Sequence, residues 1–300
     1  MNFGVFCPRS RGDSSGFRRD AWNRLLRAEA QGYHSAWLGD VETFPGDAVF
    51  PVFAPAAQLA VRTESIRIGV SLSLEADFHP LRLSEEIATL DVMTGGRIEW
   101  ATAWKDGSGE GDEAGAEGAR AREQVAIAVK AWTHGRVGWE GPCYDFPEVP
   151  CIPSPVQAPP PTFVLSASPG IRRWGREAGL RWMQPPLASL SVAQAEREDS
   201  ALCHVYVGES HRKAREEAGE SLRAIGRKAG LERSERALDS WVDDRALIGD
   251  AGYCRERIAE WLEGTDLDSL ILYPDFPDLA PEALDESQAR FIEQVAPTFA

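Results

Sequence analysis

The sequence predicts an α/β fold, a TIM-type (β/α)8 barrel, in which residues 1–300 form a single domain. Three observations support this prediction: short apolar segments alternate with amphipathic helical ones, eight strands can be distinguished, and the chain of 300 residues has the length of one barrel. Strands joined through helices over connections this short pair in parallel. A doubly wound open sheet is the alternative, but no Gly-x-Gly-x-x-Gly motif follows any predicted strand, so its dinucleotide-binding version has little support.

The first third of the chain alternates regularly between strands and helices. Residues 2–6 (NFGVF) are a short apolar run, which predicts a buried strand. Residues 20–33 predict an amphipathic helix, because Trp22, Leu25 and Ala30 fall on one face. The same alternation continues with a strand at 35–40, a helix at 51–63, a strand at 66–74, a helix at 81–96 and a strand at 97–104.

The rest of the chain is less regular. A loop of glycine and acidic residues at 106–118 precedes a helix at 117–135, and its composition fits either a mobile lid or a solvated filler. A polar stretch also interrupts the pattern after residue 230. The other expected elements are a hairpin at 137–148, a proline-rich approach at 150–161, a strand at 162–167, a helix at 170–179, a strand at 180–184, a short helix near 191–199, a strand at 201–207, helices at 209–230 and 252–264, a strand at 269–275 and a closing helix.

Composition narrows the class of protein. The chain carries 47 acidic and 32 basic residues, a formal net charge of −15, which disfavours nucleic acid and anionic membrane as partners. The 5 cysteines are scattered without zinc-like spacing, so we expect reduced thiols and no metal site. No segment reaches the roughly 18 apolar residues of a membrane span, and the N-terminus does not resemble a signal peptide, which favours a cytoplasmic protein.

In a barrel of this type the active site lies at the carboxyl ends of the strands. The chemistry available there is limited: the sequence has no carboxylate and histidine cluster with metal spacing, no Gly-x-Ser-x-Gly motif and no P-loop. Strand ends that supply serines, backbone amides and aromatic rings suit an organic cofactor that brings its own reactivity. These strand ends are Phe6 and Cys7, residues 39–42, 71–74, 103–105 and 166–170, Met183 and Gln184, Val207 and Gly208, and residues 273–275.

The segment SASPGIRRW predicts one candidate anion site. A strand there passes into a helix through small residues, so backbone N–H groups and the hydroxyls of Ser166 and Ser168 can face an anion. Arg172 and Arg173 follow within one turn of the helix. The alternative is an ordinary helix N-terminus, which has the same residue types.

Four segments, residues 28–40, 66–100, 153–183 and 247–272, carry a resemblance to a known family. Through them the chain resembles the bacterial luciferase-like flavin monooxygenases. The resemblance implies a TIM-like barrel that binds reduced FMN, or the deazaflavin F420 in some relatives, and that often forms a homodimer or heterodimer. It also implies a separate flavin reductase and the oxygenation of a small organic substrate such as an aldehyde, a ketone or an alkane sulfonate.

Several cofactor contacts follow from the resemblance. Ser168 matches a serine that holds the flavin phosphate, and the turn through Gly170 supplies backbone donors. Ile171 stands where a threonine is expected, so Arg172 or Arg173 is expected to compensate. The resemblance further implies a non-prolyl cis peptide beneath the flavin ring, around Ser71 and Leu72.

The chain also departs from the family pattern. Asp40 occupies an acidic position, but Val41 stands where many relatives carry a catalytic histidine. Ala103, Trp104 and Lys105 replace glycine, arginine and glycine after the fourth strand. We expect Trp104 to face the flavin or substrate, and Lys105 to take over part of the arginine's anion contact as a point charge.

The remaining candidates complete the hypothesis. Asp40, Glu42 and His79 are the candidates for proton transfer, although His79 precedes a proline at a helix start and could instead be structural. Phe6, Cys7, Trp104 and Tyr273 are expected to face the substrate, with core packing as the alternative for Cys7 and Trp104. Two other functions stay open: a flavin-binding protein without catalysis, and an F420-dependent oxidoreductase on the same fold.

Overall fold

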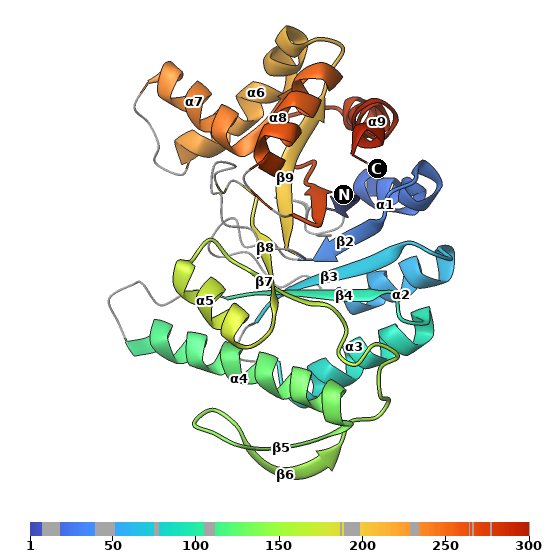
Figure 1. Cartoon of the computed structure of the whole chain (residues 1–300), viewed down its shortest axis with the longest axis vertical. Helices are drawn as coiled ribbons and strands as arrows, with labels where there is room; N and C mark the ends of the chain where they lie inside the picture. The colour runs from blue at the N-terminus through green and yellow to red at the C-terminus, as the bar shows by residue number, and fades with distance from the viewer. Residues whose placement is uncertain are drawn as a thin grey trace. The chain divides into compact units, whose positions relative to one another are not determined.

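The computed structural model describes residues 1–7, 19–39, 52–74, 78–104, 112–186, 188, 199–228, 234–263, 265, 267–276 and 278–299. These residues form two compact units, the first made of residues 1–36 and 184–300 and the second of residues 37–183. Figure 1 labels most of their helices and strands. The expectation that residues 1–300 make a single domain stays a prediction.

A parallel sheet forms the centre of the first unit. Its strands lie in the order β10, β9, β11, β1, so strands far apart in the sequence become neighbours. Val5 of β1 lies opposite Leu272 of β11, which lies opposite Cys203 of β9. The strands are nearly free of exposed residues, as expected for a parallel sheet covered by helices. Their bounds are β1 Asn2–Cys7, β9 Ser200–Val207, β10 Ala246–Gly249 and β11 Ser269–Leu272.

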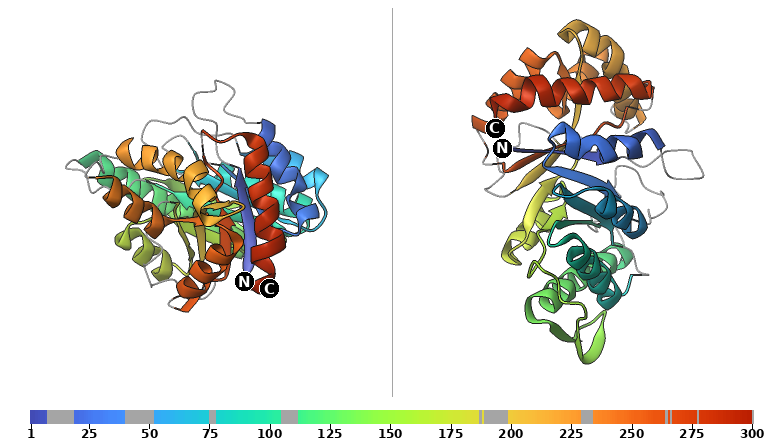
Figure 2. Two further views of the ribbon diagram at one scale, coloured as in Figure 1. Left: turned by 90° about the horizontal axis from the view of Figure 1, so that it is seen from above. Right: turned by 90° about the vertical axis from the view of Figure 1, so that its right-hand side faces the viewer.

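Helices of the first unit pack on this sheet and bring the two ends of the chain together. The amino group of Met1 donates a hydrogen bond to the carbonyl oxygen of Phe299 at 2.9 Å, and the two termini lie side by side in both views of Figure 2. The ring centroids of Phe3 and Phe291 are 5.1 Å apart. The helical segments are α1 Arg19–Gln31, α6 His211–Lys228, α7 Glu235–Arg245, α8 Ala251–Glu263, α9 Pro281–Arg290, a π-helical turn Phe291–Val295 and a 3-10 turn Ala296–Thr298.

The second unit has its own parallel sheet, in the order β2, β3, β4, β7, β8. Glycine permits close packing within it: a side chain at Gly69 would lie 1.9 Å from the indole of Trp37. Gly39, at the end of β2, has φ +130° and lies against the backbone of Ser71. The strands are β2 Ser35–Gly39, which begins at the boundary of the first unit, β3 Arg67–Ser73, β4 Ile98–Ala103, β7 Thr162–Leu165 and β8 Arg181–Gln184.

Four helices and a hairpin surround this second sheet among the described residues. The hairpin lies against α4 on the side away from the sheet (Figure 1). Glu123 of α4 fixes it by accepting hydrogen bonds from Trp139 Nε1 at 2.9 Å and from the amide of Tyr144 at 3.2 Å. The elements are α2 Phe53–Arg62, α3 Pro80–Thr94, α4 Asp112–His134, α5 Pro169–Glu177, and the hairpin strands β5 Arg136–Glu140 and β6 Asp145–Pro150.

The predicted strands and the hairpin are confirmed, with three differences elsewhere. The polar stretch after residue 230 contains helix α7 and strand β10, which the sequence did not predict. Helix α4 begins at Asp112, so residues 112–118 are helical and the acidic loop is shorter than expected. The short helix expected near 191–199 falls almost entirely outside the described residues.

The described residues contain neither a helix suited to span a membrane nor a cluster suited to bind a metal ion. None of their helices combines the length and the apolar character that a membrane-spanning segment requires. Within the same residues, no group of three or more His, Cys, Asp and Glu side chains is placed to hold a metal ion.

Candidate functional site

The turn between β7 and α5, residues 166–171, gathers hydroxyl groups and backbone amides. Ser166 Oγ accepts a hydrogen bond from the amide of Ser168 at 3.0 Å, and Ser168 Oγ accepts from the amide of Ile171 at 3.3 Å. Ser168 is thus the N-cap of α5, with Pro169 at the first helical position, where it is pre-organised for the helix. Gly170 is exposed, so its amide can face a ligand. The predicted grouping of Ser166, Ser168, Gly170 and Ile171 is therefore present.

Arg172 adds a cation to this turn. Its guanidinium carbon lies 4.2 Å from the ring centroid of Trp182 on β8. The same indole donates a hydrogen bond through Nε1 to the carbonyl oxygen of Ser166 at 2.8 Å. Trp182 therefore contacts both the start of the turn and its cation. Trp182 was not among the site residues predicted from the sequence. The sequence feature that could have indicated it is a tryptophan in the strand that directly follows the helix carrying Arg172.

The charges in the first turn of α5 favour an anion. A helix N-terminus carries partial positive charge and is normally accompanied by acidic residues. The first turn of α5 contains none, and Arg172 and Arg173 lie just inside it. A helix N-terminus offers its first backbone N–H groups to an anion. Hydroxyls, amides and a guanidinium together match a phosphate group.

The ends of β3 and β4 lie in register in the second unit. Ser71 pairs with Ala101 and Leu72 with Thr102, and both predicted cofactor residues are buried. The cis peptide expected around Ser71 and Leu72 is wrong, because the cis bonds of the described residues precede only Pro153 and Pro159. The ladder between β3 and β4 continues in register through Ser73, as extended trans backbone permits.

Trp104, predicted to face the substrate, has a packing partner on a helix. Its ring meets that of Trp174 of α5 edge to face, with centroids 5.5 Å apart, and its side chain is 6% exposed. Residues two and four apart on a strand share a face. Trp100 of β4 precedes Trp104 by four residues, Trp104 directly follows the end of that strand, and Trp100 contacts Trp132 of α4. This face of β4 is therefore directed at the helices, and a substrate contact by Trp104 stays a prediction.

His79 is the N-cap of α3 and is exposed. Its Nδ1 accepts a hydrogen bond from the amide of Leu81 at 3.3 Å. Its ring contacts two aromatic residues of the hairpin segment, with centroid distances of 5.7 Å to Tyr144 and 6.0 Å to Phe146. These contacts give His79 a structural role, and its role in proton transfer stays a prediction.

In the first unit, Phe6 and Tyr273 come together at the ends of β1 and β11. Their ring centroids are 5.4 Å apart, and His204 of β9 lies 5.0 Å from Tyr273. Phe276 also contacts His204, with ring centroids 5.6 Å apart. All four side chains are buried, as is Cys7 at the end of β1. The strand ends of this unit thus form an aromatic cluster that also contains a histidine.

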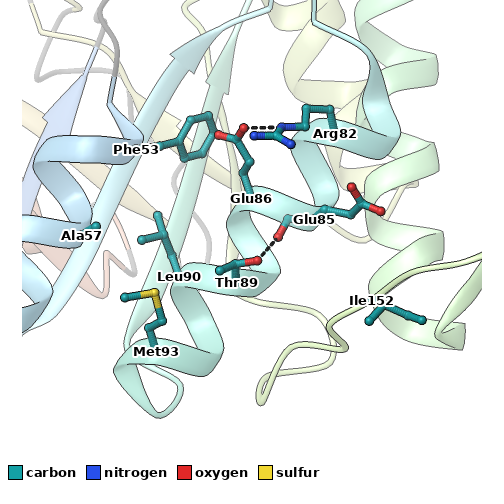
Figure 3. Close-up of a pocket in the computed structure, with 9 residues that line it drawn as sticks. All are labelled: Phe53, Ala57, Arg82, Glu85, Glu86, Thr89, Leu90, Met93 and Ile152. Atoms are coloured by element: carbon teal, nitrogen blue, oxygen red, sulfur yellow. Dashed lines mark hydrogen bonds and ion pairs between the residues drawn. The ribbon is translucent and has the colours of Figure 1, made fainter.

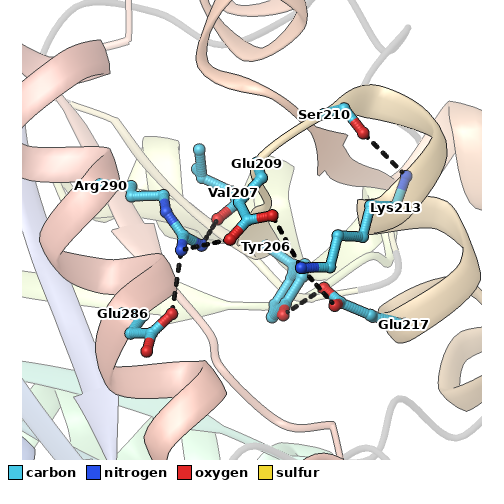
Figure 4. Close-up of polar contacts among 8 residues, drawn as sticks. All are labelled: Tyr206, Val207, Glu209, Ser210, Lys213, Glu217, Glu286 and Arg290. Atoms are coloured by element: carbon cyan, nitrogen blue, oxygen red, sulfur yellow. Dashed lines mark hydrogen bonds and ion pairs between the residues drawn. The ribbon is translucent and has the colours of Figure 1, made fainter.

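The end of β9 carries charges that are already compensated (Figure 4). Arg290 Nη2 lies 2.9 Å from Glu286, and Lys213 Nζ lies 2.7 Å from Glu209. Tyr206 donates through its hydroxyl to Glu217 at 2.8 Å. Burial and this carboxylate raise the pKa of Tyr206, so the phenol remains a donor at neutral pH. This end of the sheet is a salt-bridge network.

A shallow groove of about 360 Å³ runs between α2 and α3 on the second unit (Figure 3). Its charged side consists of Arg82, which pairs with Glu86, and of Glu85. The large apolar side chains that are exposed among the described residues belong to α2, α3 and the segment after β6: Val61, Val92, Met93, Ile152 and Val156. Met93 and Ile152 of this set also line the groove. We call the groove, together with Val61 of α2 and Val92 and Met93 of α3, the α2–α3 face.

Three predicted site residues cannot be placed. Asp40, Glu42 and Lys105 lie outside the described residues, as does Val41.

Comparison with known proteins identifies the family. The family model for the luciferase-like monooxygenase matches residues 1–268, which is most of the chain. The chain belongs to the luciferase-like monooxygenase family. The resemblance inferred from the sequence is therefore confirmed.

The chain is similar over part of its length to two proteins that are named for different cofactors. The chain is 25% identical over 198 residues to the oxygenase component of the flavin-dependent trigonelline monooxygenase of Acinetobacter baylyi, covering 62% of this chain and 55% of that protein. It is 28% identical over 170 residues to the F420-dependent glucose-6-phosphate dehydrogenase of Kineococcus radiotolerans, covering 51% and 48%. The matches thus span about half the length of these relatives.

Solved structures support the same fold. The crystal structure of monooxygenase RslO1 from Streptomyces bottropensis matches with a TM-score of 0.79 and 21% identity, covering 100% of both chains. The predicted fold class, an α/β TIM-type barrel of the luciferase-like kind, is confirmed.

Proposed function

We propose that this luciferase-like protein is the oxygenase component of a flavin-dependent monooxygenase, which uses reduced FMN and O2 to oxygenate a small organic substrate. The arrangement of the β7–α5 turn carries the proposal, because two hydroxyls, an exposed amide and a guanidinium suit the phosphate group of FMN. The trigonelline monooxygenase relative is itself named as an oxygenase component, which supports a partnership with a separate flavin reductase.

The proposed division of roles follows the sequence and the contacts at each strand end. Ser166, Ser168, Gly170 and Arg172 hold the phosphate. Bound FMN supplies the electrons for the reaction with O2, while the chain binds and orients the reactants and excludes water. The proposed further contacts to the cofactor are Ser71, Leu72, Lys105 and Ile171; those to the substrate are Phe6, Cys7, Trp104 and Tyr273; and the candidates for proton transfer are Asp40, Glu42 and His79.

A second candidate is an F420-dependent oxidoreductase. The similarity to an F420-dependent glucose-6-phosphate dehydrogenase favours it. F420 also carries phosphate, so the β7–α5 turn suits either cofactor. The two candidates differ in their use of oxygen, because hydride transfer to or from F420 needs none.

Cofactor titration separates these candidates. The protein is titrated anaerobically with reduced FMN and, separately, with F420, and the free ligand is measured by ultrafiltration. The FMN complex is then mixed with oxygenated buffer, and flavin absorbance is followed against free reduced flavin. Binding of reduced FMN together with an altered rate of reoxidation supports the monooxygenase. Binding of F420 alone supports the second candidate, and binding of neither contradicts both.

We also propose that the α2–α3 face joins two copies of the chain into a homodimer. A two-fold interface brings the same surface of each copy together, so it must be self-complementary. This face offers exposed apolar side chains on both helices, Val61 on α2 and Met93 on α3, and it carries both Arg82 and Glu85, so that the arginine of one copy can face the glutamate of the other.

A further inference from the structure

We infer that a groove between helices α4 and α5 binds a small aromatic carboxylate, with the ring of the ligand beside Trp174 and its negative charge beside Lys130. We call this feature the α4–α5 groove. The inference goes beyond the proposed function and does not rest on it, because neither residue is assigned there to the cofactor or to the substrate.

The α4–α5 groove belongs to the second unit and has a volume of about 250 Å³ (Figure 1). Val125 and Val129 of α4 lie four residues apart, so they share the helix face that forms one wall. Trp174 and Leu180 belong to the opposite wall. Pockets for drug-sized ligands measure about 300–1,000 Å³. The α4–α5 groove therefore suits a smaller molecule.

The apolar walls of the groove are incompletely covered by the protein itself. Val125 is 1% exposed, so the groove reaches the buried layer beneath α4. Val129, Trp174 and Leu180, in contrast, are only half-buried. Covering their remaining apolar surface with a ligand is favourable, because it removes that surface from water. The body of the ligand is therefore expected to be apolar.

Trp174 favours a ligand whose apolar body is a flat ring. Its indole is held from behind by the edge-to-face contact with Trp104, at a centroid distance of 5.5 Å. The part of its side chain that the protein leaves uncovered lines the groove. Aromatic pairs in offset-stacked or edge-to-face arrangements gain more than the burial of their area alone provides. A ligand ring against Trp174 would continue the aromatic contact that begins at Trp104.

The charge of the groove selects an anion. Lys130 is exposed and forms no ion pair with the described residues. Its Nζ donates to the carbonyl oxygen of Gly138 at 3.3 Å and lies 5.7 Å from the ring centroid of Trp139, so two of its three N–H donors stay available. His134 lies four residues further along α4 and also lines the groove, whereas no Asp or Glu is among its described lining residues. In a chain of net charge −15, this is a local site for a carboxylate.

The test measures the binding of naphthalene-2-carboxylate and of its neutral analogue naphthalene-2-carboxamide to the full chain without flavin, by isothermal titration calorimetry. The wild type should bind the carboxylate more tightly than the carboxamide. K130Q should weaken the carboxylate about three- to fivefold, as expected for an exposed charge pair, and leave the carboxamide unchanged. R236Q is the matched control, because it removes a cation from an exposed position of α7 in the first unit and should change neither constant.

Two further variants fill the groove and locate the ring. A178W adds an indole at an exposed lining position at the end of α5, and A126F adds a ring from α4. Each should weaken both ligands about tenfold or more, because the ligand ring loses its burial. Their unfolding midpoints, compared with that of the wild type, show that the fold is retained.

Three outcomes overturn the inference. The first is a wild type that does not bind naphthalene-2-carboxylate at millimolar concentration. The second is equal affinity for the carboxylate and the carboxamide. The third is binding that K130Q, A178W and A126F leave unchanged, because the probe then lies elsewhere on the chain. Failure of the proposed function looks different, since the wild type then binds neither reduced FMN nor F420, whatever its affinity for naphthalene-2-carboxylate.

Discussion

The indole rings of Trp104 and Trp174 meet edge to face, with centroids 5.5 Å apart, and this contact joins the end of strand β4 to helix α5. Trp104 is 6% exposed, so its replacement by alanine leaves a cavity that the sheet and helix cannot fill. We expect W104A to lower the free energy of unfolding by about 3–5 kcal/mol, measured by urea denaturation. W174A, at a less buried position, should cost less.

The same variants separate packing from a substrate contact. W104F keeps an aromatic ring against Trp174 and is expected to recover most of the stability. A W104A protein as stable as the wild type would contradict the packing role. If its turnover were lowered as well, the substrate contact expected from the sequence would be supported.

Two glycine substitutions have opposite expected effects. A methyl group at Gly69 would lie 1.9 Å from the indole of Trp37, which the core cannot accommodate without moving that ring. We expect G69A to cost about 1–3 kcal/mol or more, since overpacking forces strain on its neighbours. Gly115 lies exposed in α4 with no atom near its added methyl, so G115A should stabilise the protein by up to about 1 kcal/mol through helix propensity. Thermal and urea unfolding of the two variants should shift in opposite directions.

Most of the fold could be predicted from the sequence. Strands of a parallel sheet are buried on both faces, so each appears in the sequence as a short apolar run between two segments with the periodicity of a helix. Strand β10 was missed because ALIG is only 4 residues long and directly follows the charged helix α7. Its strand conformation depends on pairing with β9, from Ala246 opposite His204 to Gly249 opposite Val207. Such pairing is a tertiary property that local sequence does not encode.

The sequence predicted only part of the candidate site. Ser168 before Pro169 and Gly170 has the form of a helix N-cap, so its role in the turn follows from local chemistry. The contact between Arg172 and Trp182 depends on how α5 lies beside β8, and no local pattern indicates it. The alternation of a strand says that Trp100 and Trp104 share a face. It does not say that this face meets helices, which their contacts with Trp132 and Trp174 reveal.

Acid stability should depend on Asp250. Its carboxylate accepts hydrogen bonds from the amides of Tyr253 at 2.9 Å and His211 at 3.1 Å, joining the starts of α8 and α6. The hydrogen bond from Tyr253 is the main cause that lowers the pKa of Asp250 below its ordinary 3.8. A lowered pKa in the folded state stabilises the fold above the ordinary value, and this contribution is lost as the pH falls through the lowered pKa.

The variant D250N isolates this contribution. It keeps one acceptor but has no charge, so it should be less stable than the wild type at neutral pH, and the difference should shrink to near zero in acid. Urea unfolding of both proteins, from neutral pH to below the ordinary pKa of 3.8, measures the difference directly. A difference that stays constant with pH would show that the carboxylate charge does not contribute.

The α2–α3 face predicts a self-association that can be tested separately from catalysis. Met93 and Val61 are 58% and 74% exposed, so charged residues there should leave the fold unchanged but repel a second copy. We expect sedimentation velocity to show a dimer for the wild type and a monomer for the double variant V61E/M93E, with the same unfolding midpoint at low protein concentration. Charge exchange provides the sharper control: R82E and E85R should each weaken the dimer, and mixing the two variants should restore it, because opposite charges then face each other across the two-fold axis. Wild-type protein that is monomeric at micromolar concentration would contradict the homodimer.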